Sequence, residues 1–456
     1  MQSCDTFALH KNYSADHKVT LAKNSDRPLG EAQPFAFFPG GTHKKGEMLR
    51  CTHLTIPQAE HTYTVLGSRP YWIWGFEMGL NECGLMIGNE AEFSRCEAET
   101  EEGLLGMDLL RLALERADTA RNGVQVIADL LAVYGQNANA NPLFDRRYEN
   151  SYLLADRSEI WLMETAGRQW AAKKIDDWAA ISNCYSIGAD YTLCSEDLET
   201  LARENRWLRP DEPFVFAKAY GRADKQSTSL PRFRRLQRLI ALCGGQLTHK
   251  SIQAILSDHF DGTLIAPRFG AAMGSFQSIC MHANAWDTSQ TAASMIASSD
   301  DVLGPVAHYA PSLPCCSSYI PVYFLVGDTP DAMKNAAGTY DEASLWWTAE
   351  RLAMLTSVDE DRYRPMVQSA LDIIRSATPA LASQIEDVAR RLIARNQAEE
   401  AKLLLKEFTQ KETDQLMHVM KTLAEDISAD IAAAGGLYGP RKELLSAYAA
   451  RVRMPL

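Results

Sequence analysis

Cys4 is the cysteine whose position gives it a route to nucleophilic chemistry, because it begins the first strand-like run of the chain, CDTFALH. If the mature chain starts at this residue, the thiol and the α-amine belong to one amino acid, and the amine can act as the general base. Their ordinary pKa values, about 8 for the amine and about 8.5 for the thiol, allow nearly balanced proton transfer near neutral pH. A cysteine that merely packs near the terminus is the alternative interpretation.

A polar group follows in the segment LAKNSDRP, which ends the second strand-like run with Lys23, Asn24, Asp26 and Arg27. The runs 6–10 and 19–23 flank a polar turn, so they predict an antiparallel hairpin that begins at the cysteine. The hairpin would bring this segment to the same part of the molecule as the thiol. By composition alone, the segment could equally be a solvated turn.

The elements that must position these residues alternate between strand and helix patterns. Helices are indicated by Leu105, Leu109 and Leu112, and then by Val124 and Ile127, with Asp118 or Thr119 as a plausible N-cap. Strands that precede and follow the helices predict α+β layers around antiparallel sheets rather than a βαβ repeat. We expect these strands at 62–67 and 84–88, and then as a meander at 152–155, 160–165, 169–174 and 179–182.

A change of composition near residue 330 predicts two regions. Residues 331–456 contain 4 of the 27 glycines, 4 of the 19 prolines and none of the ten cysteines. Apolar residues recur there at helical spacing, as in Leu416, Met420, Leu423, Ile427 and Ile431. We therefore expect a main domain at 4–330 and a helical C-terminal extension at 331–456.

Composition also excludes several classes of function. Lys and Arg number 46 against 58 Asp and Glu, a net charge of −12 that argues against a nucleic-acid partner. The sequence contains no apolar stretch of about 18 residues, so we expect no membrane span. The N-terminus has no apolar run of signal-peptide length, which predicts a cytoplasmic protein. The ten cysteines lack paired Cys/His spacing of the zinc type, so neither a metal nor another cofactor is expected.

Four segments resemble a known family. CDTFALH, AKNSDRP, the stretch SRPYWIWGFEMGLNECGLMIGNEAEFSR at 68–95 and GLLGMDLLRLALERADTA at 103–120 are similar to the secernin/dipeptidase family of cysteine N-terminal-nucleophile (Ntn) hydrolases. The resemblance is closest over residues 4–130 and persists to about 330. It implies a four-layer αββα sandwich, to which the C-terminal helices would be added.

The resemblance also implies site residues. Cys4 takes the nucleophile position, and Asp26 the place of an Asp near the α-amine. Lys23 falls where the bile-salt hydrolase relatives usually carry Arg. Asn183 in AISNCYSI corresponds to an oxyanion donor, and Arg232 in SLPRFRRL to an Arg that supports the Cys and Asp positions. Asn89 lies near the other oxyanion donor and is chosen by its chemistry.

The expected activity is hydrolysis of a dipeptide through a Cys4 thioester, after self-cleavage of the Ser3–Cys4 bond removes residues 1–3. Trp72, Trp74 and Glu77 are candidates for the substrate pocket, since a dipeptide's ammonium group needs an acidic or aromatic partner, although core packing of these aromatics is equally compatible. The expected partner is a small-molecule substrate, and the helical extension makes a homo-oligomer reasonable.

Two other functions stay open. One is an amidase or acyltransferase that acts on a non-peptide N-acyl compound, such as a bile salt or a penicillin. The other is a secernin-like, non-catalytic regulator of secretion, in which Cys4 is modified or idle.

Overall fold

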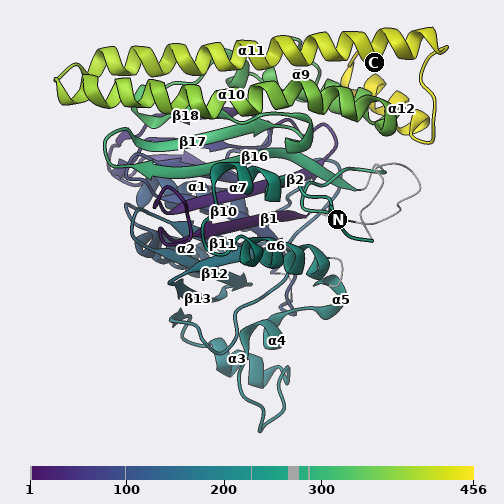
Figure 1. The fold of residues 1–456 in the computed structure, drawn as a ribbon. Helices are drawn as coiled ribbons and strands as arrows, with labels where there is room; N and C mark the ends of the chain where they lie inside the picture. Colours follow the sequence, from purple (N-terminus) through teal and green to yellow (C-terminus); the bar gives the residue numbers. More distant parts are fainter. Residues whose placement is uncertain (1–2, 98, 227–228, 265–276, 286–287) are drawn as a thin grey trace.

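The computed structural model describes residues 3–97, 99–226, 229–264, 277–285 and 288–456 (Figure 1). Its first two strands, β1 (Cys4–Leu9) and β2 (Thr20–Pro28), pair antiparallel with Cys4 opposite Ser25. The predicted hairpin is confirmed, but β2 runs further than expected. The KNSDRP segment lies inside this strand and is buried because β1 pairs on one side and β16 on the other, so the interpretation as a solvated turn is wrong.

Two antiparallel sheets form the centre of the fold. The first has the order β14-β1-β2-β16-β17-β18, with β14 (Trp178–Ile181), β16 (Ser289–Asp300), β17 (Gly304–Pro311) and β18 (Ile320–Tyr323). The second has the order β15-β13-β12-β11-β10-β9-β8-β3, with β15 (Leu193–Cys194), β13 (Gln169–Ile175), β12 (Ile160–Ala166), β11 (Glu149–Ala155), β10 (Met86–Glu92), β9 (Met78–Asn81), β8 (Val65–Ser68) and β3 (Phe35–Phe38).

The predicted meander is confirmed for three strands and wrong for the fourth. Strands β11, β12 and β13 pair in sequence order, as expected. The strand predicted at 179–182 instead leaves this sheet and pairs with β1 in the other one, as β14. The free edge of β13 is taken by β15, so the chain leaves the eight-stranded sheet before β14 and returns to it after Asn183.

Helices cover the outer face of each sheet. On the eight-stranded sheet, α1 (Gly106–Arg116) and α2 (Ala120–Tyr134) bury the predicted leucine and valine stripes, and Thr119 is the N-cap of α2. On the six-stranded sheet, α6 (Leu230–Leu242) and α7 (His249–Leu256) pack against the outward side chains of β1 and β2. With the apolar core between the two sheets, these layers make the expected α+β, four-layer αββα sandwich.

The C-terminal region is helical, as predicted. It contains α9 (Leu345–Thr356), α10 (Glu360–Ala394), α11 (Ala398–Ala433) and α12 (Lys442–Val452). Figure 1 shows α10 and α11 side by side along the β18 edge of the six-stranded sheet, which they cover. Among the described helices, even these two lack the sustained apolar stretch that a membrane crossing requires. Apolar side chains of α9 to α12 join the core that lies between the sheets, and a boundary at 330 stays a prediction.

The remaining elements are short. Two-stranded ribbons form from β4 (Gly41–Thr42) with β7 (His61–Thr62), and from β5 (Met48–Arg50) with β6 (Thr55–Pro57). The short helices are α3 (Leu198–Glu204), α4 (Phe216–Tyr220), α5 (Ala223–Gln226), α8 (Asp331–Lys334), η2 (Pro314–Cys316) and η3 (Phe324–Val326).

A buried carboxylate holds the segment that follows β14 and leads back to the eight-stranded sheet. Glu164 of β12 accepts hydrogen bonds from the backbone N–H of Ser186 at 2.6 Å and of Ile187 at 3.0 Å. The Ser186 hydroxyl donates to it as well, at 2.7 Å. Because three donors converge on one side chain, Glu164 fixes the path of the chain just after Asn183.

We therefore expect Glu164→Gln to lower the free energy of unfolding by about 1–3 kcal/mol, because an amide N–H₂ would face donors that need an acceptor. Urea denaturation of the full chain measures this change. Glu196→Gln is the matched control, since Glu196 is exposed. Equal stabilities of the two variants would contradict the anchoring role.

Candidate active site

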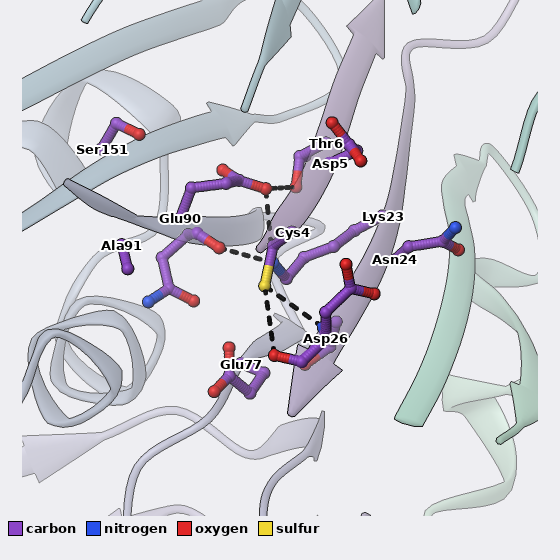
Figure 2. A network of polar contacts seen from close by, with 12 residues as sticks. Cys4, Asp5, Thr6, Lys23, Asn24, Asp26, Glu77, Glu90, Ala91 and Ser151 are labelled. Atoms are coloured by element: carbon purple, nitrogen blue, oxygen red, sulfur yellow. Dashed lines mark hydrogen bonds and ion pairs between the residues drawn. The ribbon is translucent and has the colours of Figure 1, made fainter. Parts of the chain in front are cut away.

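The thiol of Cys4 lies between the two sheets at the start of β1, and the residue is only 5% exposed. The backbone N–H of Asp26 on β2 donates to its Sγ at 3.2 Å (Figure 2). The backbone nitrogen of Cys4 donates to Oδ1 of Asn183 at 3.0 Å. The structure therefore surrounds both functional groups of this residue, the sulfur and the nitrogen, with polar partners.

A buried ion pair lies beside the thiol. Nζ of Lys23, a fully buried side chain on β2, lies 3.3 Å from Oε1 of Glu90 on β10 and also donates to the carbonyl of Asn89. Glu90 accepts from the hydroxyl of Thr6 as well (Figure 2). Gly88 makes room for this contact, since a Cβ there would lie 2.9 Å from Cδ of Lys23. The pair thus links the two sheets.

These surroundings set the protonation of the thiol. Burial raises the pKa of Cys4 strongly, the positive charge of Lys23 opposes this, and the carboxylates of Glu77, Asp26 and Glu90 add to the rise. Burial also raises the pKa of Glu90, to about 7, against the opposing effects of Lys23 and Thr6. With the peptide bond to Ser3 in place, the thiol is therefore neutral near pH 7.

Arg232 of α6 joins the parts of the site that come from distant segments. Its fully buried guanidinium lies 2.8 Å from Oδ2 of Asp5 through Nη1 and donates to Oδ1 of Asn183 at 2.9 Å through Nη2. Asn183 also donates through Nδ2 to the carbonyl of Ala91 at 2.9 Å. Arg232 therefore orients the amide that accepts from the Cys4 nitrogen.

Asp26 contributes to the site through two different groups. Its backbone N–H reaches the thiol, whereas its carboxylate accepts from the hydroxyl of Thr291 at 2.7 Å and lies 4.0 Å from Nη1 of Arg232. Burial raises the pKa of this carboxyl well above its ordinary value, against the charge of Arg232. Oδ2 of Asp26 accepts no hydrogen bond from the described residues.

Asn89 enters the site through its backbone. Its carbonyl accepts from Lys23, but its side-chain amide donates to Oδ1 of Asn150 at 3.0 Å. Side chains alternate along a strand, and Glu90 points towards β1 and β2. The structure therefore directs the Asn89 amide to the face that α1 and α2 cover.

The three predicted pocket residues divide into two groups. Glu77 is buried 3.3 Å from Nη1 of Arg27, and Trp72 donates to Glu31, which also pairs with Arg27. Trp74 instead packs on Arg111 of α1, with the guanidinium carbon 4.1 Å from a ring centre. Glu77 and Trp72 therefore lie in one charged cluster around Arg27, the residue that follows Asp26. Trp74 lies in the outer layer instead.

Several polar residues of the site carried no recognisable signal in the sequence. Asp5, Thr6 and Thr291 complete the network only because β1, β2 and β16 pair side by side. Glu90 has a weak signal, since the strand pattern of MIGNEAE puts Gly88 and Glu90 on one face.

Two of the cavities in the described residues differ in their relation to this network. A cavity of about 420 Å³ between α7, β16, β17 and α10 contains none of the predicted site residues. Another, of about 270 Å³, is lined by Tyr148, whose hydroxyl accepts from Nη1 of Arg27 at 3.5 Å. The second cavity therefore borders the cluster that contains Glu77. Within the described residues, a His and Cys group that could hold a metal lies elsewhere, around His282.

Relatives of this chain carry dipeptidase names. The sequence matches peptidase family C69 over residues 3–240 and 224–373. It is 26% identical over 416 residues to "Probable dipeptidase B" of Lactococcus lactis subsp. lactis (strain IL1403), which spans 79% of this chain and 82% of that protein. It is also 26% identical over 332 residues to a dipeptidase of Bifidobacterium longum (strain NCC 2705), across 58% of this chain and 60% of the relative.

Solved structures give weaker likenesses. A variant of conjugated bile acid hydrolase from Clostridium perfringens has a TM-score of 0.38 and 12% identity, over 68% of this chain and 89% of that one. Penicillin V acylase from Agrobacterium tumefaciens has a TM-score of 0.35 and 12% identity, over 70% of this chain and 86% of that one.

The family match spans most of the chain, so the chain belongs to peptidase family C69. It is a hydrolase that acts on peptide bonds, and its chemistry is that of a cysteine peptidase or amidase. The resemblance to dipeptidases seen in the sequence is thereby confirmed.

The Lys23–Glu90 pair offers a direct test of how the site is held. We expect Lys23→Met to lower the free energy of unfolding by about 3–5 kcal/mol, because it leaves a buried carboxylate without its counter-charge. The double variant with Glu90→Gln should recover most of this loss. Thermal and urea unfolding of the full chain measure both.

Lys174→Met is the matched control, because Lys174 forms an exposed ion pair with Glu159 that contributes roughly 0–1 kcal/mol. Additive losses in the double variant would show that Lys23 and Glu90 do not depend on each other.

Proposed function

We propose that this chain is a dipeptidase whose nucleophile is the Cys4 thiol, released together with a free α-amine when residues 1–3 are removed. The observation that carries the proposal is the pair of hydrogen bonds at Cys4, from its nitrogen to Asn183 and from Asp26 N–H to its sulfur. A residue held through both its nitrogen and its sulfur is arranged for chemistry in which the two groups exchange a proton.

Removal of the preceding residues follows from the same thiol. Sγ of Cys4 attacks the carbonyl carbon of Ser3, the C–N bond between the residues breaks, and a thioester forms as the nitrogen takes the thiol proton. Water then hydrolyses the thioester, which releases the Ser3 carboxylate and leaves both thiol and amine free on Cys4. Ser3 is buried, so the fold encloses this bond.

The new terminus changes the electrostatics of the site. An α-ammonium on Cys4 adds a positive charge next to the sulfur, which lowers the thiol pKa and offsets the effect of burial. Oδ2 of Asp26, which accepts no hydrogen bond from the described residues, is our candidate partner for that ammonium.

Turnover then has two halves. The amine takes the thiol proton, Sγ attacks the substrate carbonyl, and the amine returns the proton to the leaving amine of the dipeptide. A water molecule activated by the same amine hydrolyses the thioester and regenerates the thiol. Asn183 has two N–H donors on Nδ2, of which Ala91 takes one, so the other is available for the oxyanion.

The cavity of about 270 Å³ is our candidate route for the substrate. Its lining carries both charge signs, with Arg147 and Arg222 on one hand and Glu97, Glu99 and Glu149 on the other. A dipeptide has an ammonium and a carboxylate, so a mixed lining suits it better than an N-acyl amine.

A hydrolysis screen on dipeptides and N-acyl amines tests the proposal, with the N-terminal mass recorded on the same samples. We expect the wild type to start at Cys4 and to hydrolyse dipeptides preferentially. Cys4→Ala should keep residues 1–3 and lose activity, because it has no thiol for either reaction.

Cys194→Ala is the control, since Cys194 is an exposed thiol. Full activity in a sample that retains residues 1–3 would refute the maturation step. Preference for N-acyl amines would favour the amidase alternative, and absence of hydrolysis by a chain that starts at Cys4 would favour a regulatory role.

Asn183→Ala tests the oxyanion role. Loss of one such donor costs roughly 10²- to 10³-fold in rate, so kcat should fall by about that factor while circular dichroism stays that of a folded protein. Asn205→Ala on the exposed end of α3 is the control. Near-normal turnover by a folded Asn183→Ala variant would contradict the assignment.

A further inference from the structure

Four side chains of the kinds that bind metals meet in one cluster, although they come from three separate segments. His259 follows α7, Cys280 and His282 lie in the segment 277–285, and Cys315 lies in η2. One ligand atom from each lies within 4.8 Å of those of the other three. His259, Cys280 and Cys315 are buried, and the His282 side chain is 11% exposed.

The individual distances suit a tetrahedral metal. Nε2 of His282 lies 3.3 Å from Sγ of Cys315 and 3.8 Å from Sγ of Cys280. Zinc bonds of about 2.3 Å to sulfur and about 2.0–2.1 Å to nitrogen place tetrahedral ligand atoms roughly 3.3–3.8 Å from one another. The imidazole of His282 therefore already lies at such a spacing from each of the two sulfurs.

Residues of α10 form the surroundings that a metal site needs. Oε1 of Glu360 lies 3.9 Å from Nδ1 of His282, which leaves Nε2 directed at the sulfurs. Arg364, one helical turn on, donates to Nδ1 of His259 at 3.0 Å. Coordination through Nε2 of His259 would place a proton on that Nδ1, so metal binding requires the Arg364 contact to be released.

We propose that His259, Cys280, His282 and Cys315 bind one zinc ion as a closed, tetrahedral structural site. Two thiolates and two imidazoles are a donor set that zinc prefers, and two thiolates neutralise its charge. The sequence lacks the Cys/His spacing typical of zinc sites and therefore predicted no metal. The four ligands come from segments that only the fold brings together.

The site would hold the segment that supports Asp26. Met281 lies between two of the ligands, and its backbone N–H donates to Oγ1 of Thr291 at 2.9 Å. Thr291 in turn donates to the Asp26 carboxylate at 2.7 Å. The carbonyl of Ile279 accepts from the Asn24 side chain at 2.9 Å. A metal there stabilises β2 near the thiol without taking part in the reaction.

Metal analysis of the full chain tests the proposal without reference to its activity. After expression with added zinc and purification without chelators, we expect about one zinc per chain, and tetrahedral thiolate bands when Co²⁺ replaces it. Cys280→Ser and Cys315→Ser should each lose most of the bound zinc. Cys316→Ser is the matched control, since its buried Sγ lies 3.7 Å from Sγ of Cys315 but is not one of the four ligands.

The wild-type measurements decide the matter even if a variant does not fold. A wild type without zinc, octahedral bands with Co²⁺, or a Cys280–Cys315 disulfide in freshly purified protein would each overturn the proposal. Zinc retained in a folded Cys280→Ser/Cys315→Ser double variant would do the same.

Discussion

Charged groups buried around Cys4 impose the constraint on which the rest of this structure depends. Lys23, Arg27 and Arg232 are almost completely buried, and a buried charge is tolerated only if it is paired and hydrogen-bonded. Each has its carboxylate: Glu90, Glu31 with Glu77, and Asp5. Asp5 lies on β1 and Glu90 on β10, whereas Glu31 and Glu77 lie in the segments just before β3 and β9. Because the partners come from both sheets and Arg232 from α6, the site cannot form unless both sheets and α6 are in place.

The same pairing sets the protonation of the strongly buried Cys4 thiol. The pKa of Cys4 is raised first of all by burial, and Lys23 is the group that acts against it. The peptide nitrogen of Cys4 is held by Asn183, which Arg232 orients in turn. The pKa of this thiol therefore depends on what occupies its own nitrogen, because a charged amine there would lie closer to the sulfur than any side chain does.

Buried hydrogen bonds also connect the C-terminal helices to the sheet that carries Cys4. Glu350 of α9 is buried and accepts from Gln290 of β16, from Ser312 and from Tyr448 of α12. Arg375 of α10 donates to the carbonyls of Pro314, the first residue of η2, and of Ser317, which follows it. These contacts tie the helical region to the strand that pairs with β2, so it contributes to the rigidity of the site although it supplies none of the predicted catalytic residues.

Local patterns in the sequence determined much of this architecture. The apolar periodicity of 105–131 and 416–431 predicted the helices, and the strand-like runs 6–10 and 19–23 predicted the hairpin that begins at Cys4. Such patterns work because side-chain periodicity is a property of neighbouring residues. Only the tertiary structure decided that β14 pairs with β1 and that KNSDRP is buried. It also decided that Glu90 contacts Lys23, that Thr291 contacts Asp26, and that His259 lies near Cys315. These features depend on contacts between segments far apart in the chain, which no local pattern records.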